Sequence, residues 1–439
     1  MKKGSKILIL ALCIALLLCG TVIAINAADG NVCKIGDVEY ASISEAVEAA
    51  ADGDTVKLTA NAEIKESISI TKNLTIDLNG KTLSNTVVAF TVDTDNINFT
   101  VTGNGYINAS TMLLDVTKSA NVAVTGTNQG IVVTQSGSTV LKATESAVVS
   151  YTNVFVFAKS TSKQYFVLSK NASFIGNKFN FELDSALIPE KNTNFGLATP
   201  FNLKDNIYIK LTDSSIRTAG GLITGEAKYT AYRPGQEGKS NYGDAVDFEN
   251  VNVYANAIVF FGDNINNYYS YETDNSDDTT DSSYGDDFSI AGNININGGT
   301  LTSFYRTFVS NLSQDNVTTT DPTKSLKISL KNSTILSVRN DAYLFLRKNL
   351  AMSFDNCRIL LGTTSLANAG GTPPKDSEGN DLTVLTQPHS GAVTLLPGTR
   401  FTQKPNAESF NYTYSDGSKG ADSTTYEIAF DPAGDRQFP

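Results

Sequence analysis

A strand-and-bend phrase recurs along almost the whole chain and constrains the fold more than any other feature of the sequence. In each occurrence an apolar residue is followed two positions later by Gly, Asn or Asp, which enter the left-handed backbone region at the least cost. Successive phrases lie 23 to 42 residues apart, a period that predicts a solenoid. The apolar residues are Leu78, Val101, Val124, Tyr151, Ile175, Leu211, Phe248, Ile290, Leu330, Phe354 and Leu396.

The spacing between phrases predicts where loops are inserted. A coil of three short strands needs about twenty residues, so the shorter intervals predict bare rungs and the longer ones predict rungs that carry loops. Stretches rich in Gly, Pro, Asn and Asp support this interpretation. The expected loops lie near residues 187–201, 226–245, 262–287, 314–324 and 363–387. About eleven rungs at ~4.8 Å each predict a rod roughly 50 Å long.

The first residues predict export. Lys2, Lys3 and Lys6 precede an apolar run over residues 7–25, and small residues follow it, as in a signal peptide. The run is also long enough for an uncleaved N-terminal anchor, so that alternative stays open. We expect a secreted or surface-exposed protein with no membrane insertion after cleavage. The 439-residue chain carries a net charge of −11, which argues against nucleic acid as a partner.

A capping helix is predicted directly after the leader. Ser42 and Glu45 form a capping box, and Ile43, Ala46 and Val47 fall on one helical face. A solenoid needs such an element because its first apolar cross-section would otherwise face water.

Residues 34–83, which contain this helix and the first strands, resemble the entry cap and first coils of right-handed parallel β-helix proteins of the pectate-lyase-like superfamily. The resemblance implies an all-β, single-stranded, right-handed parallel β-helix. Its members include polysaccharide lyases, glycosidases and adhesins, so it says little about chemistry. The expected organisation is a signal peptide over 1–28, a cap over 29–62, the β-helix over 63–411 and a C-terminal cap or tail over 412–439.

One charged cluster stands out among residues expected to point outward. Lys210, Asp247 and Glu249 stand directly beside Leu211 and Phe248, the apolar residues of two adjacent phrases, which are called anchors below. The cluster is interpreted as a cross-rung ion pair. The alternative, implied by the resemblance, is a calcium-dependent lyase acting on an acidic polysaccharide, in which carboxylates hold the metal and the lysine takes the proton. Two carboxylates and one lysine are few for such an enzyme.

The other candidate residues lie in the expected loops. Tyrosines at Tyr268, Tyr269, Tyr271 and Tyr284 predict a surface that stacks on sugars or anchors a protein, with packing inside the loops as the alternative. The acidic stretch 272–287 is interpreted as a solvated loop, with Ca²⁺ binding as the alternative. His389, the single histidine, is interpreted as solvated, and residues 396–400 as a strand and bend rather than a sorting signal.

The two cysteines outside the leader, Cys33 and Cys357, lie near opposite ends of the expected rod. Their separation predicts that both are buried packing residues and form neither a disulfide nor a metal site. Together these patterns favour a non-catalytic surface module that recognises a glycan or a cell-surface protein through loops over residues 226–287. We expect no obligatory cofactor.

Overall fold

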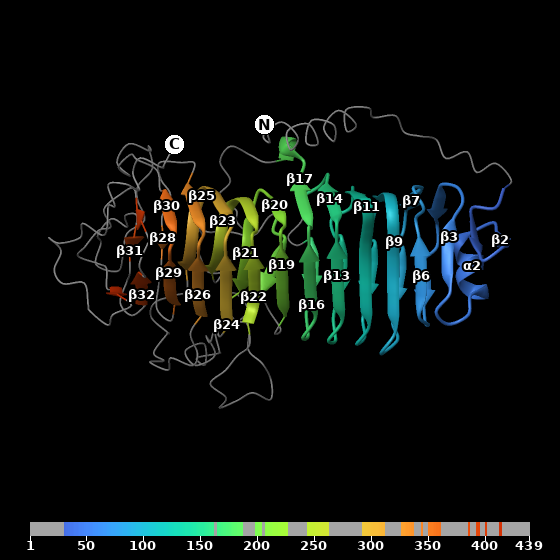
Figure 1. Ribbon diagram of the computed structural model, residues 1–439, viewed down its shortest axis with the longest axis horizontal. Coiled ribbons are helices and arrows are strands. Elements are labelled where there is room, and N and C mark those ends of the chain that lie inside the picture. Colours follow the sequence, from blue (N-terminus) through green and yellow to red (C-terminus); the bar gives the residue numbers. More distant parts are fainter. Residues whose placement is uncertain are drawn as a thin grey trace, which may run out of the picture.

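The structure is a computed structural model that describes an almost entirely β-sheet chain (Figure 1). It describes residues 30–161, 165–187, 198–203, 207–226, 244–262, 292–311, 326–337, 344–345, 350–360, 385–386, 392–395, 400–401 and 412–414. Within these ranges the helical elements are α2 (Ile43–Ala49) and the short 3₁₀ helix η1 (Ser185–Leu187). None of the helices described is long and apolar enough to cross a bilayer.

The strands follow one another in threes, and almost every strand pairs in parallel with its counterpart in the next three. We call the resulting columns face 1, face 2 and face 3, and we call one set of three strands a coil. Face 1 contains β3 (Thr55–Leu58), β6 (Leu74–Asp77), the first parts of β9 (Asn98–Ala109) and β11 (Asn121–Gln135), β13 (Val148–Thr152), β16 (Ser173–Asn177), β19 (Tyr208–Thr212), β22 (Asp244–Glu249), β24 (Gly292–Asn297), β26 (Leu326–Lys331), β29 (Leu350–Asp355), β32 (Ala392–Leu395) and β34 (Tyr412–Tyr414).

Faces 2 and 3 repeat the pattern of face 1. Face 2 contains β4 (Ala62–Ile64), β7 (Thr82–Asn85), the second parts of β9 and β11, β14 (Val154–Ala158), β17 (Asn180–Leu183), β20 (Ser215–Arg217), the first parts of β23 (Asn252–Gly262) and β25 (Thr300–Asn311), β27 (Thr334–Ser337), β30 (Arg358–Leu360) and β33 (Arg400–Phe401). Face 3 contains β5 (Ile68–Ile70), β8 (Phe90–Val92), β10 (Leu114–Val116), β12 (Leu141–Ala143), β15 (Phe166–Leu168), β18 (Phe201–Leu203), β21 (Gly221–Glu226), the second parts of β23 and β25, β28 (Leu344–Phe345) and β31 (Leu385–Thr386).

These three parallel columns are consistent with the predicted β-solenoid. In Figure 1 the coils follow one another along the long axis in sequence order, from blue at one end to red at the other. Inward residues alternate with outward ones because successive side chains on a strand point to opposite sides. In β14, for example, Val154, Val156 and Ala158 are buried, whereas Phe155 and Phe157 are partly exposed.

Aromatic rings fill the core of the middle coils. Phe166 on face 3 lies 4.9 Å from Phe174 on face 1 and 5.3 Å from Phe201 in the next coil, measured between ring centroids. Tyr151 lies 5.4 Å from Phe174, and all four side chains are fully buried. Because each ring contacts rings from neighbouring coils, the core is continuous along the rod.

The cap predicted from the sequence is confirmed. The Ser42 hydroxyl, at the N-cap of α2, accepts a hydrogen bond of 3.1 Å from the backbone N–H of Glu45. Ile43, Ala46 and Val47 are buried, and α2 contacts β3, β4 and β5, the three strands of the first coil. The strands β1 (Cys33–Ile35) and β2 (Val38–Tyr40) form an antiparallel pair, and β1 also pairs antiparallel with β3. The helix therefore covers the first apolar cross-section.

The predicted bend is also confirmed in most coils, at the corner between faces 1 and 2. After Val124 it is displaced, because Gly126 has no positive φ and Asn128 and Gly130 are left-handed instead. Residues in the left-handed region stand directly after the face 1 strands and are mostly Asn, Asp or Gly, with φ values between 47° and 97° at Asn79, Gly103, Asn153, Asp213, Asn250, Gly298, Asn332 and Asn356. Their side chains bond between coils. The Asn332 amide donates to Asn297 Oδ1 at 3.0 Å, and the Asn356 amide donates to Asn332 Oδ1 at 2.9 Å.

The register of face 1 corrects several of the expected anchors. One register position holds Val101, Val124, Tyr151, Leu211, Phe248, Leu330 and Phe354, as predicted. Ile76 takes the position expected for Leu78, because both Asn79 and Gly80 have positive φ and extend the bend there. Ile296 and Leu395 take the positions expected for Ile290 and Leu396, which lie outside the described residues.

The prediction for the anchor Ile175 is wrong by one residue. Its neighbours Phe174 and Gly176 are buried, and Ile175 itself is partly exposed. A Cβ on Gly176 would lie 2.6 Å from Leu211 Cδ2 and 3.0 Å from Phe179 Cβ. The core is therefore so full at this coil that only a glycine fits at the inward position, and the left-handed residue that follows is Lys178 instead of Asn177.

Candidate functional site

The charged cluster predicted from the sequence assembles on face 1 as two adjacent strands in register. Lys210 on β19 is the register partner of Asp247 on β22, and Lys210 Nζ lies 3.7 Å from Asp247 Oδ2. Glu249 is two residues beyond Asp247 on the same outward side and is exposed. The Lys210 and Asp247 side chains are 43% and 37% exposed. This geometry is that of a surface ion pair, a type that contributes about 0–1 kcal/mol to stability.

The neighbouring coils supply amides rather than further charge beside this pair. Asp247 is the register partner of Asn295 on β24, and Glu249 is the partner of Asn297. Among the described residues, no group of three or more His, Cys, Asp or Glu side chains could hold a metal ion. Two carboxylates with amide neighbours can accept hydrogen bonds from a ligand or weakly attract a cation.

Most of the other predicted site residues lie outside the part of the chain that the structure describes. These are Tyr268, Tyr269, Tyr271, Tyr284, the acidic stretch 272–287, His389 and residues 396–399. The described flanks nevertheless locate where the long insertions depart. Glu226 at the end of β21 is the register partner of Gly262 at the end of β23, and Gly262 is the partner of Asn311 at the end of β25. Segments 227–243, 263–291 and 312–325 therefore leave face 3 at one register position in three successive coils and return at face 1.

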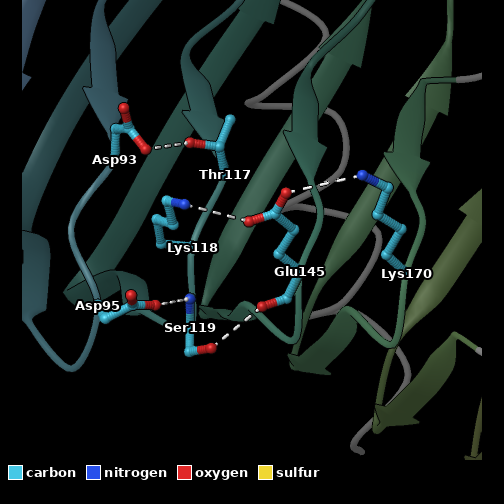
Figure 2. Close-up of polar contacts among 7 residues, drawn as sticks. All are labelled: Asp93, Asp95, Thr117, Lys118, Ser119, Glu145 and Lys170. Carbon is cyan, nitrogen blue, oxygen red and sulfur yellow. Dashed lines mark hydrogen bonds and ion pairs between the residues drawn. The ribbon is translucent and has the colours of Figure 1, made fainter.

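The corner that connects face 3 to face 1 has short turns in the earlier coils, and polar side chains link these turns to one another (Figure 2). Asp93 Oδ1 accepts from the Thr117 hydroxyl, and Asp95 Oδ1 accepts from the Ser119 backbone N–H, both at 3.0 Å. Glu145 lies between two cations, with Oε2 3.5 Å from Lys118 Nζ and Oε1 3.6 Å from Lys170 Nζ. Opposite charges thus alternate from coil to coil along this edge.

Face 2 carries an aromatic surface that the sequence analysis did not single out. Tyr106 on β9 is the register partner of Val132 on β11, and Val132 is the partner of Phe155 on β14. Tyr106 is 48% exposed, and Phe155 and Phe157 are partly exposed. The signal for this surface was the sequence of β14, VFVFA, which is apolar at both inward and outward positions. Strands solvated on one side alternate apolar and polar residues instead.

The buried ionisable groups lie in the core rather than at an exposed site. Burial raises the pKa of the Cys33 thiol and of the Cys357 thiol to about 11. Both cysteines are buried, as predicted, and their thiols are protonated at neutral pH. Burial also raises the pKa of Tyr151, whose buried hydroxyl has no hydrogen-bond partner within the part of the chain that the structure describes.

Comparison with known proteins gives this chain no relative: no family model, no curated protein and no solved structure matches it.

Proposed function

We propose that this protein is a secreted or surface-exposed right-handed β-helix of the pectate-lyase-like superfamily, with about eleven rungs, that acts as a non-catalytic binding module. A glycan or a cell-surface protein would be its partner, recognised by the insertions between residues 226 and 287. The observation that carries the proposal is the shared departure point of successive insertions. Glu226, Gly262 and Asn311 are register partners, so the insertions that follow them begin side by side on one edge of the rod.

The composition of two of these insertions supports recognition rather than simple linkage. Residues 227–243 contain Tyr229, Tyr232 and Tyr242, and residues 263–291 contain the other candidate tyrosines together with the acidic stretch. Tyrosines are enriched where proteins bind partners because each offers a large apolar ring and a polar hydroxyl. A scaffold bonded along its whole length presents such loops with little ordering cost to the scaffold itself.

The test compares the intact chain with a variant in which residues 263–291 are replaced by a short Gly-Ser linker between Gly262 and Gly292. Both proteins are applied to a glycan array and to a panel of immobilised extracellular proteins, and circular dichroism confirms that the β structure persists. We expect the intact chain to bind and the variant to lose that binding. Equal binding by both proteins would overturn the proposal.

The lyase alternative has its own measurement. The chain is incubated with polygalacturonate or alginate, with and without Ca²⁺, and the absorbance of unsaturated products is followed. Turnover that requires Ca²⁺ and disappears in Lys210→Ala would establish the enzyme and refute the non-catalytic proposal. Lys210→Arg serves as the matched variant because it keeps the positive charge beside Asp247.

A further inference from the structure

Independently of the insertions, we propose that face 2 carries a binding site for an uncharged linear polysaccharide, centred on Tyr106, Val132, Phe155 and Phe157. These four residues are called the aromatic strip below. They come from the three neighbouring strands β9, β11 and β14, all of which are described. The proposal uses no residue of the insertions and no residue of the charged cluster on face 1.

The rings of the aromatic strip are exposed or partly exposed on the outside of face 2. Hydrophobic residues on β14 occupy both sides of the strand, and the inward set, Val154, Val156 and Ala158, already fills the core. Phe155 and Phe157 therefore lie on the opposite side of the strand, where they are partly exposed. Tyr106, two strands away, is 48% exposed, which is unusual for a large ring on a regular strand. Solvent-exposed rings grouped on one rigid surface mark a binding site more often than scattered ones do.

Two of the rings are aligned along the rod. Tyr106 and Phe155 occupy one register column on either side of Val132. Neighbouring strands lie about 4.8 Å apart, so the two rings are about 10 Å apart along the rod axis. Phe157 lies two residues beyond Phe155 on the same outward side. A row of rings along the rod suits an extended polymer whose sugar rings each offer a flat C–H face for stacking.

The outer surface of face 2 around the strip is polar but carries little charge. Outward positions on face 2 from β7 through β14 are uncharged, and beside the rings they offer hydroxyls and an amide for hydrogen bonds to sugar hydroxyls: Thr82, Ser84, Asn108 and Thr134. Charged outward positions border the strip on both sides: Glu63 on β4, and Glu182 on β17, which is the register partner of Phe157 and lies 3.5 Å from Arg217. The outward strand positions of the strip hold no cation, with the exposed Lys159 following directly after β14, and the chain carries a net charge of −11. These features favour an uncharged ligand.

The size of the strip argues against a second copy of the chain as the occupant. A stable dimer buries about 800 Å² on each partner. The strip covers three strands, about 10 Å along the rod, and polar side chains surround it. A sugar chain needs far less area because single rings stack on single sugars. Self-association therefore serves as an outcome that would contradict the proposal.

The experiment measures binding of cellohexaose and mannohexaose to the purified chain by isothermal titration calorimetry, with polygalacturonate as the acidic comparison. The chain contains 18 tyrosines and no tryptophan, so tyrosine fluorescence gives a second readout. We expect at least one of the two neutral oligosaccharides to bind and polygalacturonate not to bind. Tyr106→Ala and Phe155→Ala should each weaken binding about tenfold or more, as hot-spot aromatic residues do.

Two control variants separate stacking from general surface effects. Tyr106→Phe keeps the ring and should retain binding. Val38→Ala removes a large apolar side chain that is 59% exposed in the cap, far from the strip in the described structure, and should also leave binding unchanged. Circular dichroism and sedimentation are recorded for each variant.

Three results would overturn the proposal: neither neutral oligosaccharide binds, the alanine variants bind as tightly as the parent, or the parent is a dimer that Tyr106→Ala dissociates. Replacement of residues 263–291 should leave this binding intact, so failure of the insertion proposal and failure of this one are distinguishable.

Discussion

Turns of two kinds occur on the edge where face 3 returns to face 1. In coils from β8 to β16 the connections are short, and they are linked from coil to coil by Asp93, Asp95, Glu145 and their partners. In the coils from β21 to β26 the same edge instead carries the insertions 227–243, 263–291 and 312–325. Yet Phe248, Ile296 and Leu330 stay in one register position across these insertions.

This difference shows that loops inserted at the corners of a solenoid leave its strand register unchanged. Each coil pairs only with its neighbours, so an insertion at a corner changes neither the strand register nor the inward residues. The cost of closing a longer loop rises slowly with its length. The short-turn coils are therefore expected to be the more stable region, and the coils that carry insertions the more variable one. Five measurements test this comparison, from the largest expected effect to the smallest.

The largest effect is expected in the core of the short-turn region. Phe166→Ala removes a fully buried ring that contacts Phe174 and Phe201, and it should cost about 3–5 kcal/mol of unfolding free energy. Urea unfolding followed by circular dichroism measures the change. Phe157→Ala is the matched control, because that ring lies on an adjacent strand of the same region but points outward. A similar loss in both variants would contradict the inward–outward assignment.

The two cysteines report on the two ends of the rod separately. Cys33 lies in the cap and Cys357 lies beyond β29, and burial raises both thiol pKa values from 9.0 to about 11. At pH 8 each thiol should react with a disulfide reagent about 100-fold more slowly than an unfolded one, as this shift implies. In increasing urea we expect Cys357 to react first, and single Cys→Ala variants identify which thiol is labelled.

The raised pKa values of the two thiols also determine how the stability of the fold changes with pH. Because both thiols have a higher pKa when folded, their contribution to stability is fully present below about pH 9 and is lost as the pH rises towards 11. The urea midpoint of the parent should therefore fall over this window by more than that of the double variant lacking both cysteines. Equal falls would contradict the burial of the thiols.

A smaller effect is expected at the bend between faces 1 and 2, and it should be alike in both regions. Asn153 in the short-turn region and Asn332 beyond the insertions have φ values of 53° and 51°. Replacing either by alanine should cost about 1–2 kcal/mol, because alanine resists this conformation. Glycine at either position should cost less. If Asn332→Ala left the unfolding free energy unchanged while Asn153→Ala lowered it, the two regions would differ in backbone as well as in loops.

The smallest effects are expected for the surface ion pairs of the two regions. Lys118→Ala removes a pair with Glu145, and Lys210→Ala removes the pair with Asp247; both pairs are substantially exposed. Each substitution should change the unfolding free energy by about 0.2–1 kcal/mol, and 1 M salt should remove most of the difference. A loss above 2 kcal/mol at Lys210 would mean that this residue does more than form a surface pair.

The sequence alone predicted the cap, the bend and the strand repeat because these depend on local chemistry. Ser42 caps a helix wherever it precedes a suitable apolar face, and Asn or Gly adopts a left-handed bend in any context. It predicted the pairing of Lys210 with Asp247 because both residues lie three positions before the same kind of bend, at Asp213 and Asn250. It misplaced Ile175 because an apolar pattern does not show that Phe179 already fills the space beside Gly176.

What the sequence determined about this protein is therefore the repeating unit: which residues turn, which residue caps the first coil and roughly how often strands recur. Only the tertiary structure decided which residues meet. It brought Tyr106, Val132 and Phe155 into one column although they lie far apart in the chain, and it placed the ends of β21, β23 and β25 side by side. The physical reason is that register between coils is set by filling one continuous core, a property of neighbouring coils together that no single strand encodes.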